Sequence, residues 1–261
     1  MQYSDSVDTK LQTLSLPDNE IHLWVGDLRQ EDVVCTTLEK TLTAQEIARA
    51  DRYAFPDLRQ RFVVARGILR DILARYTGIS AEILDIQQHA QGKPFLAIGR
   101  PRFNLSHSHE LSIFLLSNHR EVGVDVEYTA RHVQDLAGLA QHVLSATETN
   151  KLFALPADQQ KQAFFNAWTR KEAYVKALGC GLIQAPETIE VTLCPGETPR
   201  LLQVEGQPEA ISRWHFEAFQ YRKDYTIAAA VEGSGWNLRL WEWQPKSLPS
   251  PEWIMGERAY E

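Results

Sequence analysis

The spacing of apolar and polar residues along the chain predicts a mixture of helices and short strands. Apolar positions recur with helical spacing over residues 43–75, with a break near Pro56, and again over residues 131–156 and 164–179. Strand patterns cover residues 21–25, 83–88, 102–105, 111–116, 122–127, 188–193, 214–219 and 225–231. No apolar run approaches the roughly 20 residues that a membrane-spanning helix needs.

One order of elements occurs twice. A helix that ends in glycine, at Gly78 and again at Gly179, is followed each time by three predicted strands. This order predicts two similar α/β halves with a ligand-binding cleft between them. We expect a lead-in over residues 1–19, an N-terminal half over 20–120, a C-terminal half over 121–232 and an extended tail over 233–261.

Composition and charge narrow the class of protein. The 261 residues carry a net charge of −7, which argues against general nucleic-acid binding. Cys35, Cys180 and Cys194 are too few and too scattered for a disulfide framework or a zinc site. Residues 1–10 lack the basic and then apolar pattern of a signal peptide. We therefore expect a cytoplasmic protein.

The helix predicted over residues 164–179 carries charges on its inward side. Its apolar stripe contains Phe164, Trp168, Val175 and Leu178, and the expected polar face holds Asn166, Thr169, Arg170, Ala173 and Ala177. Lys171 and Glu172 lie on or beside the stripe, and Lys176 lies at its edge. An inward charge is costly unless it is paired or bound to an ion. The residues fit either a lysine–glutamate pair within the fold, or a metal-binding carboxylate with lysines that meet an anion.

The strand over residues 122–127 supplies two more carboxylates. Asp125 and Glu127 point to one face of it, with Cα atoms about 7 Å apart. On its own this alternation is also typical of a half-solvated strand. Together with Glu172, the two residues form a set of oxygen ligands that suits Mg²⁺.

Two further groups suit phosphate. Ser106 and His107, expected at a turn between strands, offer a hydroxyl, an imidazole and backbone N–H groups. A plain serine-rich turn fits equally well, whereas a Ser–His catalytic pair is disfavoured because adjacent residues in an extended segment point apart. Seven arginines lie between residues 49 and 75, of which we expect one or two to bind phosphate and the rest to be solvated or paired. Lys93 adds a cation at a turn. These groups favour Mg²⁺-assisted attack on phosphorus.

Four motifs now resemble those of the 4′-phosphopantetheinyl transferases of the surfactin-synthetase-activating type. They are Gly92-Lys93-Pro94, Phe103-Asn104-Leu105-Ser106-His107-Ser108, Gly123-Val124-Asp125-Val126-Glu127, and Trp168 to Lys176 with Lys171-Glu172 inside it. They occur in the family's order across residues 49–180. The resemblance implies an α+β fold of two similar α/β halves in a pseudo-twofold arrangement. Each half would be a small antiparallel sheet with a long helix, with the cleft between them.

The resemblance also implies a reaction and its residues. The family moves 4′-phosphopantetheine from coenzyme A to a serine of an apo acyl or peptidyl carrier protein, and releases adenosine 3′,5′-bisphosphate. By resemblance, Asp125, Glu127 and Glu172 hold Mg²⁺, and Glu172 or a water on the metal takes the serine proton. Lys176 would stabilise the pyrophosphate. The coenzyme A site would contain Arg49, Lys93, Asn104, Ser106 and His107, with an uncharged Gln88 where some relatives are basic.

Two further questions are the oligomeric state and the biosynthetic pathway that the protein serves. We expect a monomer that serves fatty-acid, polyketide or peptide synthesis, three pathways that the sequence does not distinguish. Two other classes fit the same residues: a Mg²⁺-dependent phosphohydrolase with water as nucleophile, and a non-enzymatic module that binds coenzyme A or a carrier protein.

Overall fold

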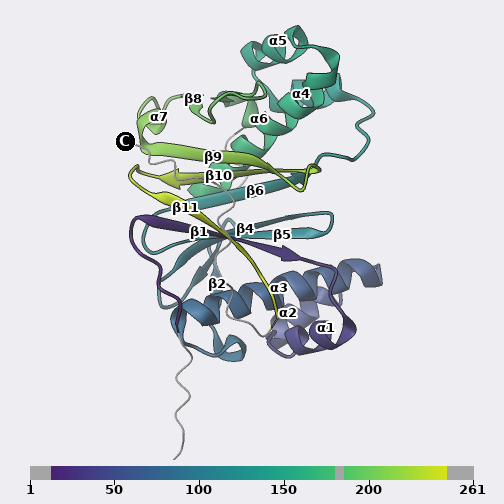
Figure 1. Cartoon of the computed structure of the whole chain (residues 1–261), viewed down its shortest axis with the longest axis vertical. Helices are drawn as coiled ribbons and strands as arrows, with labels where there is room; N and C mark the ends of the chain where they lie inside the picture. Colours follow the sequence, from purple (N-terminus) through teal and green to yellow (C-terminus); the bar gives the residue numbers. More distant parts are fainter. Residues whose placement is uncertain (1–12, 180–184, 246–261) are drawn as a thin grey trace, which may run out of the picture.

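The protein folds into four layers, with a helical layer on each side of two sheets that face one another (Figure 1). The structure, a computed structural model, describes residues 13–179 and 185–245. The first half of the chain contains β1 (Glu20–Asp27), α1 (Asp32–Glu39), α2 (Ala44–Ala50), α3 (Pro56–Thr77), β2 (Ile86–Gln88), β3 (Pro94–Leu96), β4 (Arg102–Ser108) and β5 (Leu111–Ser117). The second contains β6 (Val122–Tyr128), α4 (Leu136–Val143), α5 (Ala146–Ala154), α6 (Ala157–Leu178), β7 (Ile189–Val191), β8 (Leu201–Val204), α7 (Ala210–Arg213), β9 (Trp214–Tyr221), β10 (Tyr225–Glu232) and β11 (Asn237–Glu242).

The two sheets pack against each other through apolar side chains that occur at every second residue of their strands. One sheet has the order β11-β1-β5-β4 and the other the order β6-β10-β9. Alternate residues of β1, β5, β6 and β10 meet between the sheets in one apolar cluster. The opposite residues of β1 and β5, such as Trp24 and Phe114, pack against α3, while those of β10 pack against α6. β5 is buried along its whole length, and burial on both faces explains why it is apolar apart from Ser112 and Ser117.

The two long helices have matching boundaries. α3 and α6 are both 22 residues long, and each ends at a glycine in the left-handed conformation, Gly78 with φ of 69° and Gly179 with φ of 68°. Pro56 occupies the first turn of α3, where its missing N–H costs nothing, so the predicted break is confirmed. The predicted α+β fold of two similar halves, each a sheet with a long helix, is confirmed.

The first sheet differs from the prediction in one strand. β11 lies beside β1 and runs parallel to it, so this sheet is not purely antiparallel. The strand comes from residues that we assigned to a separate tail, and its alternation was hidden by the surrounding tryptophans and polar residues. Trp241 stacks on Trp24 with ring centroids 5.2 Å apart. The domain boundaries at residues 120 and 232 remain a proposal.

Two other predictions need correction. The sequence pattern predicts a strand over residues 83–88. Its first residue instead closes a single helical turn, Ala81–Ile83, and the strand β2 covers only Ile86–Gln88. The expected polar face of α6 is buried: Thr169 is 0% exposed and Arg170 4% exposed. A helix wheel assumes one solvated face, but β7, the segment after it, α4 and α5 cover the far side of α6. Arg170 Nη1 donates there to the backbone oxygen of Thr192, while its buried Nε has no hydrogen-bond partner.

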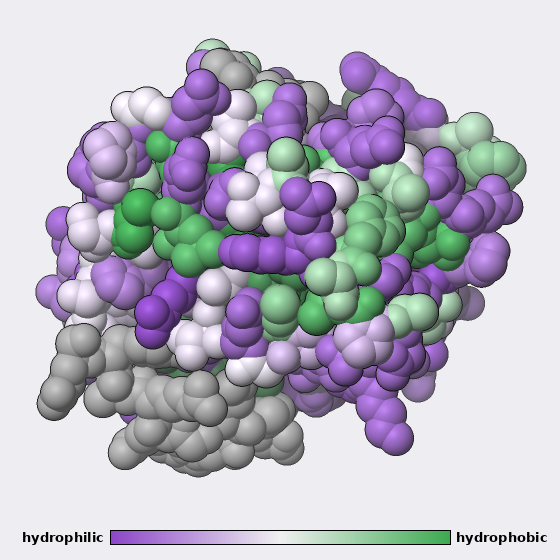
Figure 2. Space-filling view, turned by 90° about the horizontal axis from the view of Figure 1, so that it is seen from above, coloured by the Kyte–Doolittle hydropathy of each residue, from purple (hydrophilic) through white to green (hydrophobic). Residues whose placement is uncertain are grey.

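The outer face of the second half is mixed in polarity. Seen from the α5 end, apolar residues lie among charged ones and form no continuous sheet of apolar surface (Figure 2). The large apolar side chains exposed on the elements of this half are Leu139, Phe153, Leu202 and Ile211. None of the described helices has the length and apolar character that crossing a bilayer requires.

Candidate active site

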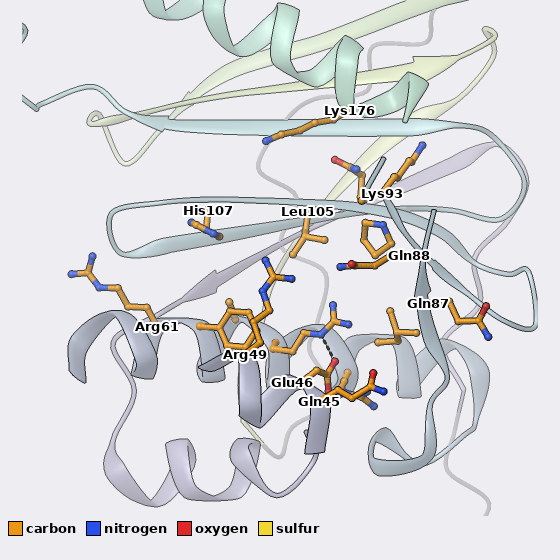
Figure 3. A pocket seen from close by; sticks show the side chains of 18 of the residues that line it. Gln45, Glu46, Arg49, Arg61, Gln87, Gln88, Lys93, Leu105, His107 and Lys176 are labelled. Carbon is orange, nitrogen blue, oxygen red and sulfur yellow. Dashed lines mark hydrogen bonds and ion pairs between the residues drawn. The ribbon is translucent and has the colours of Figure 1, made fainter. Parts of the chain in front are cut away.

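A cavity of about 1490 Å³ lies between the helices of the first half and the C-terminal end of α6. Its walls come from α2, the start of α3, the β2–β3 hairpin, the outer face of β4 and the last turns of α6. Arg49 and Arg61 approach this space from the helices, His107 from β4 and Lys176 from α6 (Figure 3). Basic groups from both halves therefore surround one volume, as expected for an anionic ligand.

A glycine sets the spacing between the carboxylate strand and α6. A Cβ atom on Gly123 would lie 2.1 Å from the backbone oxygen of Ala173 and 2.2 Å from the backbone nitrogen of Ala177. Only glycine permits this approach. It brings β6 against the helix segment that carries Glu172 and Lys176.

Lys176 and Asp125 meet at the centre of the site. Lys176 Nζ lies 2.6 Å from Asp125 Oδ1 and donates to Ser106 Oγ at 2.9 Å. Ser106 in turn donates to Asp125 Oδ1 at 2.8 Å. Asp125 Oδ2 is buried and has no hydrogen-bond partner. Burial raises the pKa of the Asp125 carboxyl, and the ammonium of Lys176 opposes that rise.

Both carboxylate oxygens of Glu127 accept hydrogen bonds, unlike those of Asp125. Its Oε1 accepts the indole N–H of Trp168 at 2.9 Å, and its Oε2 accepts the hydroxyl of Ser108 at 3.1 Å. Arg131 lies 3.4 Å from Oε2. Both oxygens of Glu127 thus have partners, whereas Asp125 keeps one oxygen free of hydrogen bonds.

Glu172 is half-buried and lines the cavity. Its pKa is raised, first by burial and then by the negative charge of Asp125, with Glu127 adding a smaller effect in the same direction. Asp125, Glu127 and Glu172 repel one another, and one buried oxygen of Asp125 has no hydrogen-bond partner. A divalent cation would fit this combination. In the part of the chain that the structure describes, however, no three His, Cys, Asp or Glu side chains are already arranged as a metal cluster. Lys176 is the cation that contacts Asp125.

The segment expected at a turn is part of a strand. β4 continues through Ser106 and His107 to Ser108, which pairs with Leu111 of β5, and the chain reverses at His109 with φ of 53°. Hydroxyl and imidazole groups interrupt the apolar pattern here, so the sequence suggested a turn. The residues nevertheless alternate correctly: Ser106 is buried and His107 is exposed toward the cavity.

The inward residues of β4 connect it to β6. Asn104 Oδ1 accepts the backbone N–H of Val124 at 3.0 Å, and Ser108 Oγ accepts that of Tyr128 at 3.0 Å. With Ser106, these side chains replace the backbone ladder that two strands in different sheets cannot form. Asn104 also lines the cavity. The sequence contains the period-two signal for this connection, but not the partner strand.

The basic wall of the cavity contains both paired and unpaired arginines. Glu46 holds Arg66 and Arg70, which explains why these two arginines are largely buried. Arg59 and Arg75 also form ion pairs. Among the described residues, no ion pair involves Arg49, Arg52 or Arg61, all three of which line the cavity. The guanidinium of Arg49 lies 5.4 Å from the ring centroid of Phe62.

His107 faces the same wall from β4. Its pKa is lowered below the ordinary value of 6.5, first by desolvation against the cavity wall and then by the charge of Lys176. Although much of its surface is accessible, surrounding atoms limit its hydration. The lowered pKa favours the neutral imidazole in the free protein.

Lys171 forms a lysine–glutamate pair within the fold, the first of the two alternatives, but its partner is Glu148 and not Glu172. Its ammonium lies 2.5 Å from Glu148 Oε2 and donates to the backbone oxygens of Val143 and Pro186. Both charged side chains are 1% exposed. Lys171 therefore contacts no anion site, and its neighbour Glu172 is not its partner. Glu148 also completes the capping box of α5 with Ser145.

Comparisons with known proteins identify the family of this chain. A model described as the 4′-phosphopantetheinyl transferase superfamily matches residues 121–230. The 4′-phosphopantetheinyl transferase HetI from Nostoc sp. is 36% identical over 238 residues, which cover 90% of this chain and 97% of HetI. The chain belongs to the 4′-phosphopantetheinyl transferase superfamily.

Other members of the superfamily match shorter stretches. A putative 4′-phosphopantetheinyl transferase from Synechocystis sp. is 34% identical over 144 residues, covering 54% of this chain and 58% of that protein. The transferase psf-1 from Bacillus pumilus is 30% identical over 146 residues, covering 56% and 61%. A holo-(acyl-carrier-protein) synthase from Bacillus anthracis, solved with CoA (3′,5′-ADP), covers 44% of this chain and 96% of its own at 23% identity and a TM-score of 0.36. An overlap this small places no residue of the present chain.

Proposed function

We propose that the protein transfers the 4′-phosphopantetheine group from coenzyme A to a serine of an apo carrier protein and releases adenosine 3′,5′-bisphosphate. The observation that carries this proposal is the pairing of Lys176 with Asp125 beside Glu172, at the end of a cavity with basic walls. Membership of the transferase superfamily supports the same reaction.

Residues of the site have separate roles in the transfer reaction. Glu172 accepts the proton of the carrier serine, because its raised pKa makes it a stronger base than an exposed glutamate. The serine oxygen forms a bond to the β-phosphorus, and the bond from that phosphorus to the bridging oxygen breaks. Lys176 stabilises the charge that develops on the departing phosphate. Ser106 orients Asp125 and Lys176 together.

The cavity residues bind the rest of coenzyme A. Arg49 and His107 take the 3′-phosphate, since Arg49 lacks an ion pair among the described residues and His107 faces it across the cavity. Asn104 supports the wall, and Lys93 borders it at Gly179.

Mg²⁺ is the proposed cofactor. Asp125, through its unpartnered oxygen, and Glu172 would hold it, with Glu127 as the third ligand. When bound, the ion neutralises pyrophosphate charge and polarises the phosphorus. The partners of Glu127 orient that side chain for this role.

We also propose the surfactin-synthetase-activating subtype and a monomer in the cytoplasm. One chain supplies both walls: Arg49 and His107 come from the first half, and Glu172 and Lys176 from the second, where Asp125 contacts Lys176. A second copy is therefore not needed to complete the site.

The test is a reaction of the protein with coenzyme A, Mg²⁺ and a panel of apo carrier proteins from fatty-acid, polyketide and peptide synthesis. Intact-mass analysis of the carrier should show the gain of one phosphopantetheine group. Loss of coenzyme A without that gain would indicate a phosphohydrolase, and binding without either change would indicate a non-enzymatic module.

A further inference from the structure

The ammonium group of Lys93 joins the two halves of the molecule at the end of the catalytic helix. Lys93 Nζ lies 2.8 Å from Glu121 Oε2, at the start of β6, and donates to the backbone oxygen of Ala177 at 2.7 Å. Lys93 itself lies in the turn between β2 and β3, in the first half. Its side chain is only 11% exposed, so these contacts are shielded from solvent.

The bond to Ala177 fits the needs of a helix end. The last four carbonyl groups of a helix have no intrahelical partner, and the C-terminus carries partial negative charge. Lys93 provides a cation at one of these carbonyls, directly after Lys176. A buried cation at this position restrains the last turn of α6.

Gly179 makes room for this contact. A Cβ atom at position 179 would lie 2.8 Å from Lys93 Cδ. The lysine stem therefore passes against the backbone where α6 ends. Gly123 supports the same turn from the other side, because β6 packs directly on Ala173 and Ala177. The turn that carries Lys176 is thus held between β6 and Lys93.

We infer that Lys93 is a positioning residue, which fixes the last turn of α6 and thereby the ammonium of Lys176, rather than a phosphate-binding residue. Both of its described partners are protein oxygens, Glu121 Oε2 and Ala177 O. A phosphate would have to displace these buried contacts to reach Nζ. This inference rests on the proposed function, because it assigns Lys93 a role in the same reaction.

The test compares Lys93→Met and Lys93→Arg with wild-type protein, and uses Lys151→Met as the matched control. Lys151 is an exposed lysine on α5, outside the cavity. Hydrogen exchange of the amides at residues 175–178 is measured in the ligand-free protein. Values of kcat, KM and the ratio of dissociation constants for dephospho-coenzyme A and coenzyme A are measured for the same variants.

A positioning role predicts faster amide exchange at residues 175–178 in Lys93→Met and a kcat lower by about tenfold to a hundredfold. The ratio between the two ligands stays at its wild-type value. Lys93→Arg, which keeps the charge and can donate to both oxygens, restores most of kcat and of the protection. Lys151→Met resembles wild type in every measurement.

Two results would overturn the inference. One is a ligand ratio that collapses in Lys93→Met while exchange is unchanged, which would assign Lys93 to the 3′-phosphate. The other is a Lys93→Met protein with wild-type exchange and wild-type kcat. If wild-type protein itself transfers nothing, the proposed function fails, and the exchange measurement still decides whether Lys93 holds the helix end.

Discussion

The three carboxylates of the site lie in different environments, because each has different neighbouring side chains. Asp125 is buried, faces Lys176 and keeps one oxygen without a partner, whereas Glu127 has both oxygens occupied by hydrogen bonds. Strand periodicity places Asp125 and Glu127 on one face of the strand. Strand periodicity reports a direction, but it carries no information about which neighbour fills each lone pair.

The first prediction concerns this difference. Asp125→Ala removes the unpartnered buried oxygen and should abolish most transfer activity and most binding of Mn²⁺ or Mg²⁺, an effect on the order of several kcal/mol. Glu127→Gln keeps an oxygen for Trp168 or Ser108 and should lose less of both. Calorimetric metal titration and carrier modification measure the two effects. Wild-type metal affinity and activity in Asp125→Ala would remove this residue from the metal site.

The second prediction concerns the 3′-phosphate. Wild-type protein should bind coenzyme A more tightly than dephospho-coenzyme A by about 1.5–3 kcal/mol, the range for charge-assisted hydrogen bonds. Arg49→Ala should reduce this difference, whereas Arg59→Ala, whose guanidinium pairs with Glu39 and Asp51, should preserve it. Titration of both ligands into each variant gives the difference. A preference that Arg49→Ala leaves unchanged would move the site to Arg52 or Arg61.

The third prediction concerns pH. The pKa of His107 lies below 6.5 in the free protein because of desolvation and the charge of Lys176. A bound phosphate favours the imidazolium, so the pKa of His107 rises in the complex. Binding therefore takes up a proton between the two pKa values, and affinity for coenzyme A should increase as pH falls through that interval.

Calorimetry in buffers of different ionisation enthalpy measures this proton uptake. His107→Gln should bind coenzyme A with a smaller uptake, which leaves only the titration of the phosphate itself. Equal proton uptake in the two proteins would show that His107 does not face the phosphate.

At the scale of elements, the sequence pattern of α6 predicts some features of this helix correctly and misses others. Its capped C-terminus at Gly179 and the inward position of Lys171 and Glu172 follow from the sequence, because helix geometry fixes both. The burial of its far side does not follow, since it depends on a later segment, β7, that packs on it. The same limit applies to β4: its serines interrupt the apolar pattern and predict a turn, but they lie in a strand and form hydrogen bonds to the neighbouring strand β6.

The fourth prediction concerns the buried pair behind α6. Lys171→Met leaves Glu148 charged and uncompensated, and should lower the free energy of unfolding by about 3–5 kcal/mol. Lys171→Met combined with Glu148→Gln removes that charge and should be less destabilised, because the introduced amide oxygen can still accept from the backbone N–H of Val191, as the carboxylate does. Urea unfolding compares the variants. A stable Lys171→Met protein with a raised KM for coenzyme A would instead place Lys171 at the ligand.

For the whole molecule, the repeated order of a helix and three strands was enough to predict two halves and a cleft. The parallel strand β11 was not predictable, because nothing local links residues 237–242 to residues 20–25. The cavity and its basic wall depend on long-range packing in the same way. The sequence shows seven arginines in residues 49–75, but only the fold separates those paired with Glu46 from those that line the cavity with no ion pair among the described residues.

The proposed function requires that a single chain form one site at which coenzyme A and a carrier serine react. The most direct measurement follows holo-carrier and adenosine 3′,5′-bisphosphate together in one reaction, by intact mass and chromatography, for wild type and Glu172→Gln. We expect the two products to form in equal amounts with wild-type protein and both to be nearly absent with Glu172→Gln. Release of the bisphosphate without holo-carrier, or unchanged transfer by Glu172→Gln, would contradict it.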